Sequence, residues 1–287
     1  MKKLAISISG GGMLGIGPLA YMAKVEKDYN ISISDYAVAF AGTSTGAIIA
    51  GLLNEGRSAT EIFDLYRANV KSIFTKYPWW KRWLPKVPTY DNRNLKKMLQ
   101  ENLSGSCSDW KKPIFIPATH MNGESVEKVW DLGDHVPKWF AVLTSTAAPT
   151  YFDVVVEGGQ SYMDGGMWKN SPVSVLNAGL NRSAYRGDVK IMSFDTGLTT
   201  PNTAKGNMTW LGWLKYLKGD FIARSSRSGD YEVRADIGTS NVLLCSPSYY
   251  KKIPMDAVDN ETIETVISLW TAYYNDTRLF LDEFMEK

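Results

Sequence analysis

The stretch "FAGTSTGAIIAG", residues 40–51, joins two apolar runs through a cluster of small residues. Within it, Gly42-Thr43-Ser44-Thr45-Gly46 has the form G-x-S-x-G, in which a serine occupies a sharp bend between a strand and a helix. Glycine tolerates the cramped backbone of such a bend because it has no Cβ. The pattern predicts a nucleophile elbow at Ser44. The alternative is a plain small-residue turn, since five-residue patterns of this kind recur by chance.

The segments around the elbow alternate between predicted strands and helices. A strand over residues 4–9 leads through three glycines into a helix over residues 18–27, and a strand over residues 36–41 leads into a helix that begins at Ala47. Two strands that each run directly into a helix indicate βα units and a parallel sheet. We therefore expect an α/β fold in which helices flank a mostly parallel central sheet.

The rest of the chain continues this pattern. Ser58-Ala59-Thr60-Glu61 is a capping box that predicts the start of a helix. Gly158-Gly159 lies between two short apolar runs and predicts a β-hairpin over residues 154–163. Apolar periodicity predicts the remaining elements, namely helices over residues 92–103, 137–145 and 262–284 and strands over residues 114–119, 126–131 and 189–194.

Composition narrows the classes of function. The 287 residues carry 32 Lys plus Arg against 30 Asp plus Glu, a net charge of +2, so the sequence lacks the basic excess of nucleic-acid-binding proteins. Cys107 and Cys245 lie far apart and fit neither a disulfide framework nor a zinc site, which suits a reduced cytoplasmic setting. The first apolar run is too short for a secretion signal, and no window approaches the ~20 apolar residues of a membrane span. We expect any membrane contact to be peripheral.

A serine nucleophile needs a base, and the candidates are few. The only histidines are His120 and His135, and they fit poorly to the order Ser, acid, His of an α/β-hydrolase because no histidine follows residue 135. We expect both to be structural or surface residues. Asp164 is available instead, followed by Gly165 and Gly166, although Asp-Gly is also a common turn.

A glycine-rich segment follows the first predicted strand. Residues 10–15, "GGGMLG", satisfy G-x-G-x-x-G, and Asp35 lies twenty residues beyond Gly15 at the end of "ISIS", which has the alternation of a second strand. This alternative predicts a nucleotide-binding oxidoreductase. The same glycines can instead present consecutive backbone N–H groups to an oxyanion.

In combination, four segments resemble the patatin-like phospholipases. They are Gly10–Gly15, the elbow at residues 42–46, "TSTAAPTYF" at residues 144–152 and "DGG" at Asp164, and they occur in that family's order over about the first two thirds of the chain. The resemblance implies a three-layer α/β sandwich. It also implies a patatin-like catalytic core over residues 1–200 and a C-terminal helical part of the same domain over residues 201–287.

The resemblance also implies roles for individual residues in a lipid acyl hydrolase of the phospholipase A or lysophospholipase type. Ser44 is the nucleophile and Asp164 its base, in a Ser-Asp dyad that forms an acyl-enzyme with no cofactor and no metal. The oxyanion hole falls on Gly10, Gly11 and Gly12. Five further glycines support the motifs: Gly15, Gly42, Gly46, Gly165 and Gly166.

Three positions depart from the family pattern. Ser9 stands where the family usually has Asp, Leu14 where it has Arg or Lys, and Ser171 where it often has a second Asn. Loss of the cation at Leu14 bears on the preference for a lipid headgroup. A non-catalytic patatin-like module that binds lipid or protein is a further alternative, but it has no chemical need for both Ser44 and Asp164.

Two aromatic segments predict a lipid surface as the partner. Residues 77–90, "YPWWKRWLPKVPTY", mix tryptophans with Lys and Arg, as interfacial segments do. Residues 210–221, "WLGWLKYLKGDF", place their large apolar side chains near one face of a predicted helix. The alternative for both is that the rings pack onto the domain's own core. We expect a phospholipid or other acyl-ester lipid at a membrane surface, and no nucleic acid.

Overall fold

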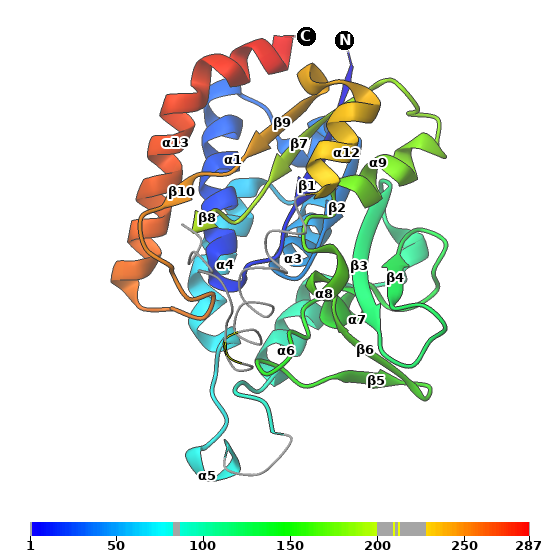
Figure 1. Ribbon diagram of the computed structural model, residues 1–287, viewed down its shortest axis with the longest axis vertical. Coiled ribbons are helices and arrows are strands. Elements are labelled where there is room, and N and C mark those ends of the chain that lie inside the picture. The colour runs from blue at the N-terminus through cyan, green and yellow to red at the C-terminus, as the bar shows by residue number, and fades with distance from the viewer. Residues whose placement is uncertain (1, 83–86, 200–208, 210–211, 213–227, 287) are drawn as a thin grey trace.

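Helices cover both faces of one central sheet, which gives the three layers expected from the sequence (Figure 1). The computed structural model describes residues 2–82, 87–199, 209, 212 and 228–286. The helix predicted over residues 210–221 lies almost entirely outside the described residues. None of the described helices combines the length and the apolarity needed to cross a bilayer.

The central sheet is mixed and mostly parallel. Among the described residues it has eight strands, in the order β5-β6-β3-β2-β1-β7-β9 with β4 paired to β3. The parallel strands are β1 (Lys3–Ile8), β2 (Ala39–Gly42), β3 (Ile114–His120), β7 (Val189–Phe194) and β9 (Val242–Cys245). The antiparallel strands are β4 (Glu127–Trp130), β5 (Val155–Glu157) and β6 (Gln160–Asp164). A separate parallel pair consists of β8 (Leu198–Thr199) and β10 (Ser248–Tyr249).

The helices divide between the two faces of the sheet (Figure 1). The face with the larger core carries α1 (Ile16–Tyr29), α3 (Thr45–Asn54), α4 (Ala59–Ile73), α6 (Arg93–Asn102), α7 (Lys138–Ser145) and α13 (Asn260–Glu286). The other face carries α9 (Val173–Asn181) and α12 (Ser228–Ile237). The short elements are η1 (Gly12–Gly15), α2 (Ile33–Tyr36), α5 (Trp79–Arg82), η2 (Cys107–Asp109), α8 (Gly166–Lys169) and η4 (Thr239–Asn241).

Strand periodicity assigns side chains to these two cores. Successive side chains of a strand point to opposite faces, so Leu4, Ile6 and Ile8 of β1 pack in the larger core while Ala5 between them packs toward α9. All four of these residues are buried. Both faces of the parallel strands are therefore covered, which explains why β1 reads as an almost continuous apolar run.

Two local signals in the sequence are confirmed. The Ser58 hydroxyl accepts the N–H of Glu61 while the Glu61 carboxylate accepts the N–H of Ser58, so the capping box opens α4 as predicted. The hairpin between β5 and β6 turns at Gly158 and Gly159, which both have positive φ. Such backbone conformations suit glycine because other residues rarely adopt them.

The segment "ISIS", which the dinucleotide-binding alternative needs as a second strand, is not a strand. Its second half enters α2, and β2 begins only at Ala39. The cause is a tertiary contact, because the buried Glu26 carboxylate accepts the N–H of Ile33 at 3.0 Å and the N–H of Ala59 at 2.9 Å. A carboxylate at the start of a helix satisfies backbone donors and complements the helix dipole, so Glu26 stabilises the starts of α2 and α4 together.

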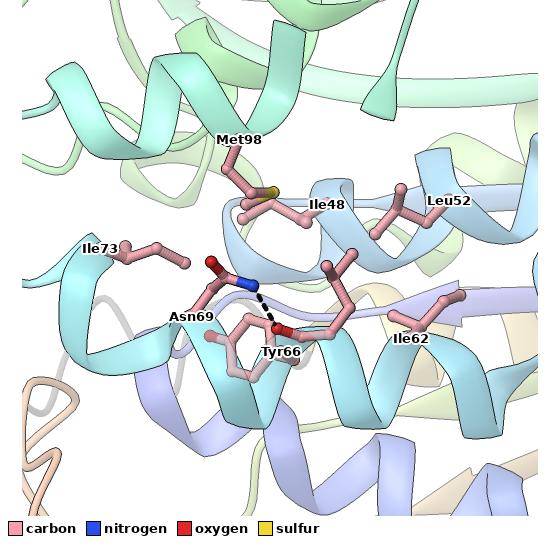
Figure 2. Close-up of a pocket in the computed structure, with 8 residues that line it drawn as sticks. Ile48, Leu52, Ile62, Tyr66, Asn69, Ile73 and Met98 are labelled. Atoms are coloured by element: carbon pink, nitrogen blue, oxygen red, sulfur yellow. Dashed lines mark hydrogen bonds between the residues drawn. The ribbon is translucent and has the colours of Figure 1, made fainter. Parts of the chain in front are cut away.

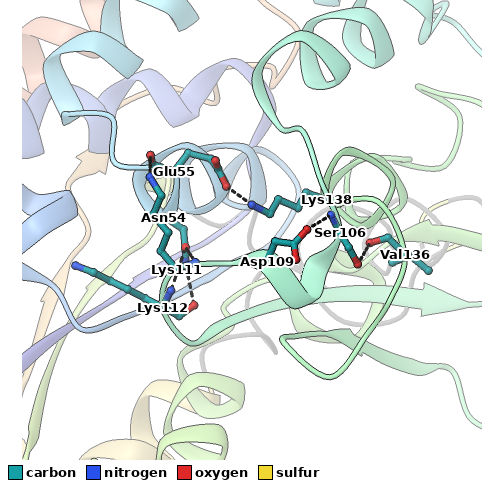
Figure 3. A network of polar contacts seen from close by, with 8 residues as sticks. All are labelled: Asn54, Glu55, Ser106, Asp109, Lys111, Lys112, Val136 and Lys138. Atoms are coloured by element: carbon teal, nitrogen blue, oxygen red, sulfur yellow. Dashed lines mark hydrogen bonds and ion pairs between the residues drawn. The ribbon is translucent and has the colours of Figure 1, made fainter.

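A polar network anchors the far end of α3 (Figure 3). The Lys138 ammonium of α7 pairs with the Glu55 carboxylate at 2.6 Å, and Lys111 donates to the Glu55 carbonyl at 2.5 Å. Asn54 accepts the N–H of Lys111 and donates its own amide to the carbonyl of Lys112. Cations near the C-terminus of a helix interact favourably with its dipole. The network therefore fixes the helix that starts directly after Ser44.

Candidate active site

Ser44 lies on the turn between β2 and α3, where it is the N-cap of the helix with φ 54° and ψ −124°. Residues other than glycine rarely adopt such a backbone, and it persists only where the surroundings enforce it. A Cβ on Gly46 would lie 2.1 Å from the carbonyl oxygen of Ile8, and a Cβ on Gly42 would lie 2.0 Å from the carbonyl oxygen of Gly46. The strand, turn and helix expected of the elbow are present.

Strand β6 ends at Asp164 and brings its carboxylate to Ser44. The Ser44 hydroxyl lies next to this carboxylate, which accepts the N–H of Gly166 at 2.7 Å. Asp164 is only 5% exposed, and loss of hydration raises the pKa of its carboxyl to about 6, against the lowering effect of the Ser44 hydroxyl and the Gly166 N–H. An aspartate with this pKa is a stronger base than an ordinary one and is still mostly ionised at neutral pH.

Ser145, the last residue of α7, holds the backbone of the elbow. Its hydroxyl accepts the N–H of Ser44 at 3.0 Å and donates to the carbonyl of Pro117 at 2.6 Å. Two residues later, the carbonyl of Ala147 accepts the N–H of Asp164 at 3.0 Å. One short segment therefore fixes both Ser44 and Asp164. The sequence contained this segment only as a motif, and nothing in it predicted that Ser145 bonds to the elbow.

The glycine segment after β1 passes next to Ser44. A Cβ on Gly10 would lie 2.8 Å from the Cβ of Ser44. The N–H of Gly10 is occupied, because it donates to the carbonyl of Asn170 at 3.3 Å. The N–H groups of Gly11 and Gly12 meet no acceptor within the part of the chain that the structure describes. Of the three glycines expected to supply donors, Gly11 and Gly12 have theirs free.

Contacts from three directions hold this glycine segment. The Thr196 hydroxyl, just after β7, and the Asn170 side-chain amide donate to the carbonyl of Gly10 at 3.0 and 3.3 Å. From the segment before α13, the carbonyl of Met255 accepts the N–H of Met13 at 2.7 Å. Side chains approach closely enough that a Cβ on Gly11 would lie 2.2 Å from the Thr196 hydroxyl oxygen. Thr196 and Met255 come from outside every motif found in the sequence.

The remaining motif glycines allow close approaches of the chain around the site. A Cβ on Gly15 would lie 2.0 Å from the Thr45 methyl group, and one on Gly165 would lie 2.2 Å from the carbonyl oxygen of Pro117. A Cβ on Gly166 would lie 2.9 Å from the Asp164 carboxylate. Leu14, at the position where the family usually has a cation, is buried in the larger core.

The histidines and Asp35 lie apart from this arrangement. His120 hydrogen-bonds to Gln160 at 2.6 Å and stacks on the ring of Tyr162, and His135 is exposed. Asp35 is exposed in α2, before β2 begins. The dinucleotide alternative needs an acidic residue at the end of the second strand. That requirement is not met at Asp35.

An apolar hollow opens at Ser44. It is shallow and open to solvent, with room for little more than one water molecule (about 20 Å³), and its walls include Ile48 of α3 together with Phe74 and Phe152. A second hollow, too narrow to admit a water molecule, continues between α3, α4 and α6 and shares Ile48, Tyr66 and Ile73 with the first. Figure 2 shows this second hollow with Ile48, Leu52, Ile62 and Met98 around it, and the amide of Asn69 bonded to the backbone of its own helix.

A comparison with protein families decides the assignment. The model described as patatin-like phospholipase matches residues 6–177, more than half of the chain, and this range contains Ser44, Asp164 and all three glycines of the loop. The chain belongs to the patatin-like phospholipase family.

Curated relatives of this patatin-like chain are phospholipases and patatin-like proteins. The cGAMP-activated phospholipase of Vibrio cholerae is 26% identical over 249 residues, with 72% of this chain and 69% of that protein covered. The intracellular phospholipase A2 of Caenorhabditis elegans is 27% identical over 222 residues, covering 68% of this chain and 20% of that protein. Patatin-like protein 2 of Oryza sativa is 29% identical over 206 residues, covering 58% and 50%. The match therefore spans between a fifth and about two thirds of these relatives.

Among solved structures, VipD from Legionella pneumophila resembles the patatin-like chain with a TM-score of 0.48 and 12% sequence identity. The alignment covers 96% of this chain and 67% of that chain. The family assignment rests on the sequence match and not on this structure.

Proposed function

We propose that this protein hydrolyses carboxylic esters of lipids, with Ser44 as the nucleophile and Asp164 as its base. The observation that carries the proposal is the position of the buried Asp164 carboxylate beside the hydroxyl of Ser44, a serine held in a strained turn. Family membership supports a lipid substrate. The names of the relatives from Vibrio cholerae and Caenorhabditis elegans support a phospholipid in particular.

The reaction follows from these positions. As the Ser44 oxygen bonds to the ester carbonyl carbon, Asp164 accepts the hydroxyl proton and the carbonyl electrons move onto oxygen. The free N–H groups of Gly11 and Gly12 are the donors for this oxyanion, and the start of α3 adds a favourable dipole. The ester C–O bond then breaks, and Asp164 returns the proton to the leaving alcohol.

The second half of the reaction releases the acid. Water attacks the acyl group on Ser44 while Asp164 accepts a proton from it, and the C–O bond to Ser44 breaks with return of the proton to the serine oxygen. One carboxylate thus serves both steps. A pKa near 6 suits this double use, because the group must accept a proton and give it back.

The apolar lining of the hollow supports an acyl group as part of the substrate. Ser44 and Ile48 lie four residues apart at the start of α3, so they face the same side of the helix. An acyl group on Ser44 would meet Ile48 first (Figure 2), and because the side chains between α3, α4 and α6 leave no space for a water molecule, a chain that passes beyond Ile48 has to displace them. Apolar walls with few polar groups suit a hydrocarbon chain.

Labelling with a fluorophosphonate, followed by mass spectrometry of the peptides, tests the nucleophile. We expect the adduct on Ser44 and no adduct in Ser44→Ala. Asp164→Ala should label and turn over on the order of 10³ times more slowly while remaining folded, because the serine loses its base. His120→Ala and His135→Ala are the matched controls and should keep wild-type turnover. An adduct on another serine, or turnover that depends on a histidine and not on Asp164, would contradict the proposal.

A further inference from the structure

The segment around α5 carries exposed aromatic rings. Trp79 is 69% exposed and Trp80 54% exposed, and Figure 1 shows α5 standing out from the body of the molecule. Residues 76–82, which we call the α5 tip, contain Lys76, Lys81 and Arg82 and no acidic residue. The Lys81 ammonium lies 5.5 Å from the centre of the Trp80 ring. The tip therefore combines bare tryptophans with positive charge.

The base of the α5 tip is joined to the rim of the Ser44 hollow. Phe74 precedes the tip and Phe152 precedes β5, and their rings, 5.8 Å apart between centres, both line the hollow. The Tyr77 hydroxyl donates to the Asp153 carboxylate at 2.9 Å, which ties the tip to the segment that enters β5. The α5 tip and the segment that enters β5 thus both begin at the rim of the hollow, where they contact each other.

Strand β5 adds exposed apolar side chains at this place. Val154 is 43% exposed and Val156 is 62% exposed, directly after the Asp153 that binds Tyr77. We call Trp79, Trp80, Val154 and Val156 the apolar edge. These four exposed side chains belong to two segments that the Tyr77–Asp153 bond joins, and exposed apolar surface of this kind commonly marks a binding site.

We propose that the apolar edge docks the protein on an anionic phospholipid surface and places the mouth of the Ser44 hollow against the lipid. Tryptophan rings settle at the headgroup level of a bilayer, and Lys and Arg beside them are attracted to anionic headgroups. The continuity of the edge with the rim of the hollow is what favours lipid over a protein partner. The delivery of substrate rests on the proposed function, whereas the docking itself does not.

Vesicle sedimentation with the full chain tests the docking. The Ser44→Ala background is used so that turnover does not change the vesicles, which contain phosphatidylcholine with or without phosphatidylglycerol. We expect binding to the anionic vesicles that weakens with added salt. Trp79→Ala/Trp80→Ala should bind about tenfold more weakly, because two interfacial rings are lost.

The chain offers a matched control for loss of exposed apolar side chains. Leu279 and Phe280 are 78% and 66% exposed near the end of α13, and the C-terminus lies at the other end of the molecule from α5 (Figure 1). Leu279→Ala/Phe280→Ala should bind vesicles like the parent. Equal losses in the two variants, or no binding of the parent to anionic vesicles, would overturn the proposal.

Two further measurements separate the remaining explanations. With Ser44 intact, the ratio of activity on vesicles to activity on a soluble short-chain ester should fall in the tryptophan variant and not in the control. If no ester is hydrolysed but the tryptophan-dependent binding persists, the proposed function fails and the docking stands. If light scattering shows that the parent is a dimer and the tryptophan variant is a monomer, the apolar edge joins two copies of this chain and the docking proposal fails.

Discussion

Asp164 carries a charge that its burial opposes, and this conflict sets the expected pH dependence. Desolvation raises the pKa of the carboxyl from its ordinary value of 3.8 to about 6. The base must be ionised to accept the Ser44 proton, so activity is absent well below this pKa and present above it. We expect kcat/KM on a soluble ester to rise through a single ionisation near pH 6 and to level off above about pH 7. A midpoint near 4, or a flat profile across this range, would contradict the assignment of Asp164 as the base.

We expect Ser145 to be a positioning residue, because its contact with the proposed nucleophile is a hydrogen bond to the backbone N–H of Ser44. Ser145→Ala leaves the Ser44 N–H and the Pro117 carbonyl without their partner, both in a buried environment. An unsatisfied buried polar group costs about 1–3 kcal/mol, and the strained elbow is free to relax. We expect kcat to fall about tenfold or more with little change in KM, since a small displacement of a reacting group is costly.

The Ser145 prediction has a matched control and a rescue. Ser7 is a second buried serine, in β1, and its hydroxyl has no partner within the described residues, so Ser7→Ala should leave kcat unchanged. Ser145→Thr keeps a hydroxyl and should recover part of the activity. The rate of fluorophosphonate labelling should follow kcat across these variants. If Ser145→Ala only lowers stability and labels Ser44 at the normal rate, the residue has a structural role alone.

Elements with local signals were predictable, and elements defined by distant partners were not. The capping box of α4 and the glycine turn of the β5–β6 hairpin lie within a few residues of sequence and were predicted correctly. Strand β9 has only four residues, and its pairing with β7 makes it a strand. The "ISIS" segment alternates like a strand, but the Glu26 carboxylate, from a different helix, makes part of it helical.

The residues of the candidate site divide in the same way, into those with a local signal in the sequence and those defined by distant contacts. Ser44 and Asp164 stand in motifs that a reader of the sequence can find, because each needs particular neighbours in the chain to form its turn. Thr196 and Met255 act on the glycine segment through contacts that join residues far apart in the sequence. Such contacts leave no pattern in a single sequence. The two groups that we propose to react could therefore be named from the sequence, whereas the residues that hold them in place could not.

At the far end of α3, the pair of Lys138 and Glu55 is expected to contribute to stability. The Lys138 side chain is 5% exposed and that of Glu55 is 21% exposed, so solvent screens the pair only in part. Lys138→Met leaves a poorly hydrated carboxylate alone, and breaking such a pair costs about 3 kcal/mol at the buried limit. We expect urea unfolding to show that the free energy of unfolding falls by somewhat less than this value. Glu55→Gln/Lys138→Met should regain part of the loss, and a double variant as unstable as the single one would contradict this account.

Across the whole molecule, the C-terminal part of the chain completes a site whose motifs lie in the first two thirds. Residues 250–259 cross from β10 to α13 and pass over the glycine segment. The carbonyl of Met255 accepts the N–H of Met13, and the Asp256 carboxylate accepts the Tyr90 hydroxyl at 2.5 Å. A Cβ on Gly12 would lie 2.3 Å from the Met255 carbonyl oxygen, so the two backbones are in close contact. The family match ends at residue 177, well before this segment.

Asp256→Ala should therefore impair catalysis without touching any reacting group. Removing the bond to Tyr90 frees residues 250–259, and the Met255 carbonyl no longer holds Met13 and the neighbouring Gly11 and Gly12. We expect kcat on a soluble ester to fall several-fold and trypsin to cleave faster after the exposed Lys251 and Lys252. Asp259→Ala is the matched control, because Asp259 caps the start of α13 through the N–H of Thr262 at 2.8 Å and does not contact the glycine segment. Faster cleavage with unchanged kcat would show that this segment covers the glycines without holding them.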